Sequence, residues 1–321
     1  MGEERFVLGR QRNSNNQTAI SDVVLLGFEI FPNIRVFVFV LLLLIYGLTV
    51  CGNLLIIILV AYSKTLHSPM YFFLSQLSTS DIMLATNIVP STLHGVLHKR
   101  GRITFGECIV QLTFFVFSGS TECVILAVMS YDRYMAICKP LHYTSVMNPT
   151  FCVNISGLSW LFSILIMVIC ANTVTKLDFC GPNVVDHFFC DPTALAKIAC
   201  SDTTIIDLPI MYLSVPVLYM PFLSIIISYS YVVSTVLKIP TRSGKEKAFS
   251  TCSSHLTVVF IFYITLICMY SVPFSGASIN INKVMSLMYT AGTPLINPVI
   301  YSLRNKDIKV AVEKVTKFCT C

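Results

Sequence analysis

The run TFFVFSGSTECVILAVM (residues 113–129) is followed at once by SYDRYMAICKPLHY (130–143). A helix needs about 20 mostly apolar residues to cross a bilayer, and this run nearly reaches that length before Asp132 and Arg133. Ionisable residues beside an apolar span are costly and usually have a function, although an arginine can also simply extend to the aqueous interface. The junction therefore predicts a membrane-spanning helix that ends in an ion pair, which would release Arg133 when a partner docks.

The composition of the whole chain supports a membrane protein. Of 321 residues, 55% are hydrophobic and only 12% are charged, and the mean hydropathy is +0.76. A soluble domain has about 25% charged residues, and a large soluble core is built from shorter helices with one polar face. The net charge of +6 does not indicate a nucleic-acid partner, because the basic residues fall mainly in predicted loops and the tail.

Apolar runs along the chain predict an all-α bundle of seven transmembrane helices. The predicted spans are 36–62, 70–94, 108–135, 151–172, 205–237, 248–272 and 281–303. The second and seventh are the least hydrophobic, and the second contains Asp81, Asn87 and Pro90. Residues 1–35 then form an N-terminal segment, 36–303 the transmembrane domain and 304–321 a tail, in which spaced valines among lysines predict a short amphipathic helix in contact with membrane lipid.

The distribution of basic residues predicts the orientation in the plasma membrane, because lysine and arginine are enriched in cytoplasmic loops. One side of the predicted bundle carries Lys64, Lys139, Lys238, Arg242, Lys245, Lys247, Arg304, Lys306, Lys309, Lys314 and Lys317. The other side has fewer basic residues, mixed with acids. The first side is therefore expected in the cytoplasm together with the C-terminus, and the N-terminus outside. A glycosylation sequon at Asn16 agrees with that assignment.

Four cysteines fall on the predicted outer side. Cys108 begins the third span, and Cys180, Cys190 and Cys200 lie in the loop between spans four and five. Cysteines in an oxidising compartment are expected to pair. Four cysteines allow three pairings, and their spacing alone does not choose among them.

Several motifs occur in order along the chain and carry a resemblance to a known family. They are Gly52-Asn53, LHSPMYFFLSQLSTSD (66–81), MSYDRYMAICKPLHY (129–143), Ser228-Tyr229, KAFSTCSSH (247–255) and PLINPVIYSLRN (294–305). With them the chain resembles a rhodopsin-like G protein-coupled receptor, and more narrowly a vertebrate olfactory receptor of the tetrapod-type subgroup. Two positions depart from the usual family pattern: Ser130 replaces an alanine, and Ile264 replaces a glycine.

The resemblance implies specific pairings and switch residues. It implies the disulfides Cys108–Cys190 and Cys180–Cys200. The residues implied in coupling to a G protein are Asp132, Arg133, Tyr134, Tyr229, Lys245, Lys247, His255, Asn297, Pro298 and Tyr301. Tyr229 and Tyr301 would move toward Arg133 on activation, and His255 would contact the third span. Alternatively, His255 is a core histidine whose hydrogen bonds are satisfied within the bundle, and Lys245 and Lys247 are solvated charges with no role in coupling.

Two carboxyl groups, Asp81 and Glu122, fall inside predicted spans two and three. Burial of an isolated carboxylate is costly, and a close pair needs either a cation or a proton. The resemblance implies a sodium ion in the inactive state, with Asn53 and Asn297 as polar neighbours. Two protonated acids in a hydrogen-bond network are the alternative. No other cofactor is expected.

The resemblance places a ligand site in the outer half of the bundle. The candidate residues are Phe115, Val116, Gly119, Ser120, Leu213, Val217, Leu266, Ile267, Tyr270, Leu287 and Thr290. Most are apolar, which suits a small and largely apolar ligand. Phe115 occupies the place where amine receptors carry an acid, which argues against a charged amine. Each of these residues could instead serve only in helix packing.

The expected function is therefore that of an odorant receptor, which binds small apolar odorants and activates the stimulatory olfactory G protein to raise cyclic AMP. A receptor for an endogenous metabolite outside the nose is one alternative. A transporter is another, but the sequence shows no internal repeat of the kind that transporters have. The chain contains no P-loop, nucleophile elbow or HExxH motif, so it is not expected to be an enzyme.

Overall fold

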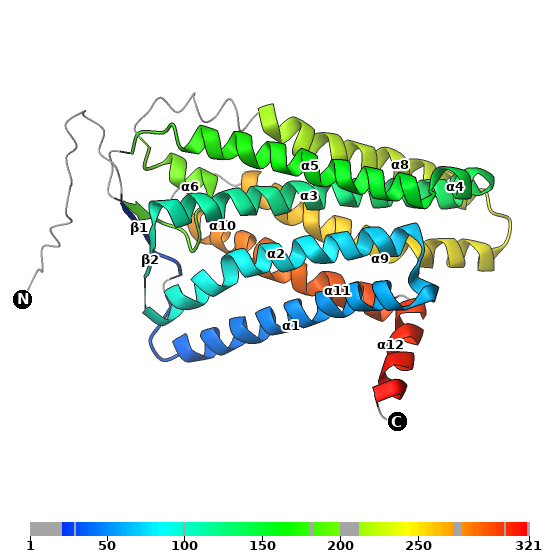
Figure 1. The fold of residues 1–321 in the computed structure, drawn as a ribbon, viewed down its shortest axis with the longest axis horizontal. Helices are drawn as coiled ribbons and strands as arrows, with labels where there is room; N and C mark the ends of the chain where they lie inside the picture. The colour runs from blue at the N-terminus through cyan, green and yellow to red at the C-terminus, as the bar shows by residue number, and fades with distance from the viewer. Residues whose placement is uncertain are drawn as a thin grey trace, which may run out of the picture.

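The computed structural model describes residues 21–28, 30–98, 100–179, 183–199, 212–271, 278–304 and 306–319. Long helices run side by side along one axis (Figure 1). In chain order they are α1 (Arg35–Tyr62), α2 (Pro69–His98), α3 (Phe105–Cys138), α5 (Pro149–Val174), a π-helical turn (Val215–Tyr219) leading into α8 (Met220–Leu237), α9 (Arg242–Ser271), and α10 (Ser278–Leu287) joined by a second π turn (Met288–Gly292) to α11 (Thr293–Arg304). Each predicted span thus corresponds to a helix, and residues 205–211 of the fifth lie outside the described residues.

The helices differ in hydropathy as the sequence predicted. Within the described residues, α1, α3, α5, Tyr212–Leu237 and Cys252–Tyr270 are long and apolar enough to cross a membrane. The second and seventh spans do not reach that threshold. They carry polar groups that the bundle buries, among them Asp81 and Asn297, whereas leucines on α5 are exposed on the outside. Polar side chains inside and apolar side chains outside are typical of a protein whose solvent is lipid.

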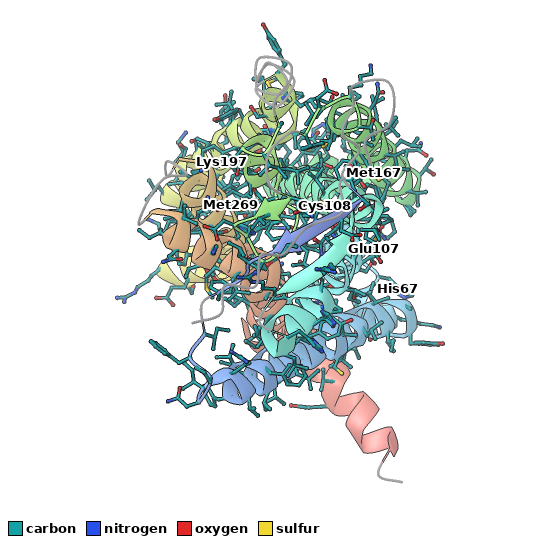
Figure 2. All side chains as sticks on the ribbon, turned by 90° about the vertical axis from the view of Figure 1, so that its left-hand side faces the viewer. His67, Glu107, Cys108, Met167, Lys197 and Met269 are labelled. Atoms are coloured by element: carbon teal, nitrogen blue, oxygen red, sulfur yellow. A yellow bond between two sulfur atoms is a disulfide. The ribbon has the colours of Figure 1, made fainter. Side chains whose placement is uncertain are left out.

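One end of the bundle carries a small sheet that the all-α prediction omitted. Strand β1 (Asp22–Leu25) pairs antiparallel with β2 (Gly101–Thr104) and parallel with β3 (Val184–Val185). Figure 2 looks onto this end and shows Cys108 beside these strands. Cys108 is bonded to Cys190, as predicted. We call this the disulfide end.

The opposite end, which we call the Arg133 end, carries two further helices. The short α4 (Pro140–Val146) follows α3, and α12 (Lys306–Cys319) points away from the bundle, steeply inclined to its long axis (Figure 1). Ile308 of α12 is only 1% exposed and belongs to the main core, whereas Val310 is 46% exposed. The Tyr71 hydroxyl of α2 donates to Asp307 at 2.9 Å. The predicted amphipathic tail helix is therefore present, with its apolar face partly against the bundle itself.

The Gly52-Asn53 motif of α1 packs against the proline inside α11. Because Pro298 has no N–H, the carbonyl of Pro294 one turn earlier lacks its usual helical donor. The Asn53 side-chain amide donates to that carbonyl at 2.9 Å. A Cβ atom at Gly52 would lie 3.2 Å from the Pro298 ring. The two residues thus provide the donor and the space that a proline-containing seventh span requires.

Candidate functional site

A cavity of about 400 Å³ lies in the disulfide half of the bundle, between α3, α5, the fifth span and α9. Eight of the predicted ligand residues line it: Phe115, Val116, Gly119, Ser120, Leu213, Val217, Leu266 and Tyr270. Their side chains are mainly apolar or aromatic, and none of the described lining residues is charged. The volume and lining fall within the usual range for small-molecule pockets.

Three predicted lining residues do not line the cavity. Ile267 is 46% exposed on the outside of α9. Leu287 packs among the core side chains between helices. Thr290 is fully buried and donates its hydroxyl to the Ser286 carbonyl at 2.8 Å. These residues therefore serve packing within the bundle or face its surroundings, which was the alternative left open by the sequence.

The cavity also has walls that the sequence did not predict. The additional lining residues are Cys123, Ile166, Cys170, Pro192, Thr193, Ser214, Leu218, Tyr219 and Tyr289. Two come from α5, which was not expected to reach the ligand. Two more come from α6 (Pro192–Ala196), which lies in the segment 183–199 that contains Cys190. We call this segment the disulfide loop, and it places α6 over the cavity. The available signal was the run Phe-Cys-Asp-Pro (189–192). A bond from Cys190 to Cys108, at the start of α3, holds this segment against the end of the bundle, where it can cover a cavity beside α3.

The disulfide loop is fixed over the cavity by polar and aromatic contacts. The Cys190 backbone N–H donates to the Gln111 side chain at 2.9 Å. The Phe189 ring lies 5.0 Å from that of Phe115 on the cavity wall. Asp191 accepts from the first backbone N–H groups of α6 and so caps it. The second predicted disulfide, Cys180–Cys200, and the sequon at Asn16 lie outside the described residues.

The floor of the cavity is formed by Tyr289, which was not a predicted site residue. Its ring packs edge-on against Phe115 at 5.7 Å and against Phe262 at 5.7 Å. Its hydroxyl donates to Oε2 of Glu122 at 3.4 Å. A Cβ atom at Gly119 would lie 2.7 Å from that hydroxyl. The absence of a side chain at Gly119 is therefore what lets the phenol reach the buried acid.

Below the cavity, Asp81 and Glu122 lie in a buried polar cluster. Asp81 accepts from the Asn297 amide at 3.0 and 3.2 Å. The buried side-chain oxygens of the described residues that have no hydrogen-bond partner include Glu122 Oε1, Ser118 Oγ and Asn53 Oδ1. Unsatisfied buried oxygens are uncommon. Carboxylate, hydroxyl and amide oxygens are the donors that a hard cation prefers, so the cluster fits the predicted sodium ion.

At the Arg133 end, the predicted ion pair is present. Arg133 donates to Asp132 of the same helix, and its side chain is only 12% exposed. The other oxygen of Asp132 accepts from the Tyr143 hydroxyl of α4 at 2.8 Å. Tyr134 lies beside Asp132 and Arg133 in α3, and its ring is 5.8 Å from that of Tyr231. Asp132 is therefore bound from two elements, one of which the sequence did not identify.

The structure also places the other predicted switch residues, of which Asn297 lies on Asp81 and Pro298 against Gly52. The Tyr229 hydroxyl and His255 Nδ1 are 2.6 Å apart, so His255 bonds to the fifth span. A contact with the third span stays a prediction. Tyr301 is buried, and within the described residues its hydroxyl has no hydrogen-bond partner. Lys245 is half-buried, and the Lys247 side chain lies outside the described part of the chain.

A family model described as olfactory receptor matches residues 42–318 of this chain. The chain belongs to the olfactory receptor family. Among its relatives, olfactory receptor 13A1 of Homo sapiens is 41% identical, with 96% of this chain and 94% of the relative aligned. Olfactory receptor 2G3 of Homo sapiens is 44% identical over 94% and 97%, and olfactory receptor 1M1 of Mus musculus is 42% identical over 94% and 96%.

Membership settles the coarse function of this olfactory receptor. It is a seven-transmembrane, G protein-coupled odorant receptor of the plasma membrane and not an enzyme. The structure brings eight of its predicted ligand residues together in the disulfide half. Asp132 and Arg133 are paired at the Arg133 end, whereas the predicted switch residue Asn297 lies on Asp81 in the buried acid cluster. Tyr289, Gly119 and Glu122 lie between the two.

Proposed function

We propose that this receptor binds small, largely apolar odorants in the 400 Å³ cavity. The observation that carries the proposal is the cavity's lining, which is apolar and aromatic with no charged member among the described residues. A charged ligand would lose its hydration there without an ionic partner, which is costly. The Ser120 and Thr193 hydroxyls already donate to the Phe117 carbonyl and to Asp191, so each can accept from one polar atom of the ligand, and the Tyr270 hydroxyl can donate.

We also propose that the disulfide end faces the outside and the Arg133 end the cytoplasm. A disulfide persists in an oxidising compartment, and the Cys108–Cys190 bond lies at one end only of the described bundle. Lysines and arginines predominate at the other end, as the positive-inside rule requires for cytoplasmic segments. The N-terminus is then extracellular and the C-terminus cytoplasmic, and the amphipathic helix α12 lies against the inner leaflet.

The transducer is the stimulatory olfactory G protein, so that ligand binding raises cyclic AMP. The assignment is supported by three motifs that the receptor shares with its family, Asp132-Arg133-Tyr134, KAFSTCSSH (247–255) and PLINPVIYSLRN (294–305). In the present structure Arg133 is bound by Asp132, and Asp132 by Tyr143. An odorant shifts the population only through its greater affinity for the state in which Arg133 is released. Tyr229, His255 and Tyr301 are the nearby groups that rearrange, and Lys245 and Lys247 contribute to the docking rim.

A sodium ion between Asp81 and Glu122 stabilises the inactive state. The unpaired oxygens of Glu122, Ser118 and Asn53 support this assignment. An ion held there neutralises the two carboxylates, whose mutual repulsion would otherwise oppose burial of both charges. The Tyr289 hydroxyl and the Asn297 amide hold the two acids in place.

The proposal is tested by measuring cyclic AMP in cells that express this receptor with the olfactory stimulatory G protein. A broad odorant panel is applied to the wild type and to Arg133→Ala, with surface staining of both. We expect a dose-dependent rise with neutral odorants that is lost in Arg133→Ala at equal surface level. Responses confined to charged amines, or an undiminished response in Arg133→Ala, would contradict the proposal.

A further inference from the structure

The last turn of α2 contains two exposed histidines that no part of the odorant mechanism uses. His94 and His98 are separated by four residues in the stretch LHGVLH. Residues four apart lie on the same face of a helix, one turn above the other. Their imidazole rings are stacked with centroids 4.2 Å apart and planes 26° apart. The two rings therefore already share one small region of the surface at the disulfide end.

A backbone hydrogen bond determines which nitrogen of His98 is available. His98 Nδ1 lies 3.0 Å from the His94 carbonyl oxygen. A carbonyl oxygen can only accept, so Nδ1 donates its hydrogen, and in the neutral ring Nε2 keeps a free lone pair. A metal-bound histidine is commonly oriented in this way, with its second nitrogen donating to a backbone carbonyl. The bond leaves Nε2 of His98 as the atom able to bind a metal.

The position in the helix also favours a cation. His98 is the final residue of α2, and the C-terminal end of a helix carries partial negative charge from its unpaired carbonyl groups. Among the described side chains, Arg100 is the nearest cation along the chain. Arg100 lines a separate cavity together with Gly95 and Val96, which lie between the two histidines in the sequence. Neither histidine lines that cavity, so Arg100 has surroundings that the histidine pair does not share.

From these observations we infer that His94 and His98 form a binding site for a divalent transition-metal ion such as Zn²⁺ or Cu²⁺. Imidazole nitrogen suits both metals, and histidines four apart on a helix are a recurring zinc-binding arrangement. Within the described residues no group of three or more His, Cys, Asp or Glu could hold a metal. The site therefore has two protein ligands, and water completes the coordination. The exposed rings turn out of their stack to direct both Nε2 atoms at the ion.

A metal ion at this site would brace the junction between α2 and the sheet. A Cβ atom at Gly95 would lie 3.6 Å from the backbone nitrogen of Gly101, so the last turn of α2 packs directly on the start of β2. β2 pairs with β1, which in turn pairs with β3. Figure 1 shows α2 ending beside β2 at this end of the bundle. Closing a ring between His94 and His98 holds that final turn in the helical conformation.

The test uses full-length receptor purified in lipid nanodiscs through an affinity tag that contains no histidines. Zn²⁺ affinity is measured by isothermal titration calorimetry for the wild type, His94→Asn, His98→Asn and the double variant. Loss of a second-shell partner lowers metal affinity by about 10–100-fold, so we expect loss of a direct ligand to lower it by at least about tenfold. His67→Asn is the matched control, because His67 is exposed at the Arg133 end (labelled in Figure 2) and should leave the affinity unchanged.

A spectroscopic measurement distinguishes this site from binding by cysteines elsewhere. With one equivalent of Cu²⁺, electron paramagnetic resonance should show two coordinated nitrogens in the wild type and one in each single variant. Odorant responses measured without added metal should match the wild type in both variants, which shows that they fold. Wild-type Zn²⁺ affinity in the double variant, or no Zn²⁺ binding to the wild type, would overturn the inference.

Discussion

The hydroxyl of Tyr289 lies 3.4 Å from Oε2 of Glu122, while its ring forms the floor of the ligand cavity. One side chain therefore contacts both the cavity in which we propose that an odorant binds and the buried acid cluster below it. A ligand that displaces the ring also changes the hydrogen bonding of Glu122. This contact gives the disulfide half and the Arg133 half of the receptor a direct physical connection.

Gly119→Ala should abolish the odorant response, because the added methyl group would lie 2.7 Å from the Tyr289 hydroxyl and would also enter the cavity. In the double variant Gly119→Ala with Tyr289→Phe, the hydroxyl is absent and part of the response should return. The readout is the cyclic AMP dose–response at matched surface expression. Gly157→Ala on α5 is the control, since nothing lies within 4 Å of its added Cβ. A normal response in Gly119→Ala alone would contradict this role for Tyr289.

Tyr143→Phe should raise signalling in the absence of ligand. Burial, and then the neighbouring Asp132 carboxylate, raise the pKa of Tyr143, so its hydroxyl stays protonated and donates to Asp132. Without that bond Asp132 is held by Arg133 alone, and the ion pair opens more often. Basal cyclic AMP per receptor at the cell surface is the measurement. An unchanged basal level would show that α4 does not restrain the ion pair.

Sodium should oppose activation through the acid pair. In membranes from cells that express the receptor, replacing sodium with a large organic cation should lower the odorant concentration needed for half-maximal G protein activation. In Glu122→Gln the effect of sodium should shrink or vanish, because one carboxylate ligand is lost while the shape is kept. Glu107→Gln, an exposed acid at the start of α3, is the control. Equal sodium effects in the wild type, Glu122→Gln and Glu107→Gln would contradict the proposed sodium site.

Acid should destabilise the disulfide loop through His187. Burial lowers the pKa of His187 from 6.5 to about 4, with Asp191 acting against that shift and Lys283 adding to it. The unfolded chain binds a proton near pH 6.5, and the folded chain only near pH 4. Stability is therefore lost as the pH falls through this window, by roughly 2 kcal/mol between pH 7 and pH 5. Thermal melting at both values should show a smaller pH difference in His187→Gln.

The sequence predicted which segments span the membrane because hydrophobic length is a local property of the chain. It predicted the Asp132–Arg133 pair from an acid and a base at the end of an apolar run, and the Cys108–Cys190 bond from a family resemblance. It did not predict the sheet, because β1 and β2 have four residues each and β3 has two. Their pairing depends on three segments that are distant in the chain.

The ligand residues show that helical periodicity alone does not predict which side chains line the cavity. Leu266 and Tyr270 are one turn apart and share the cavity face of α9, whereas Ile267 lies on the adjacent face and points outward. In the seventh span the π turn at Met288–Gly292 inserts an extra residue per turn and changes which side chains face inward. That change brings Tyr289 to the cavity in place of the predicted residues Leu287 and Thr290. No feature of the local sequence predicts the π turn.

The pair Leu266 and Ile267 also provides the most direct test of the central claim that the odorant binds in this cavity. Leu266→Phe adds volume inside the cavity, whereas Ile267→Phe adds the same kind of side chain on the lipid-facing surface. The measurement is the cyclic AMP dose–response of both variants to an odorant that activates the wild type, at matched surface levels. We predict a shift of at least about tenfold in the half-maximal concentration for Leu266→Phe, which corresponds to about 1.4 kcal/mol, and none for Ile267→Phe. Equal responses in the two variants, or a shift only in Ile267→Phe, would contradict the placement of the odorant in this cavity.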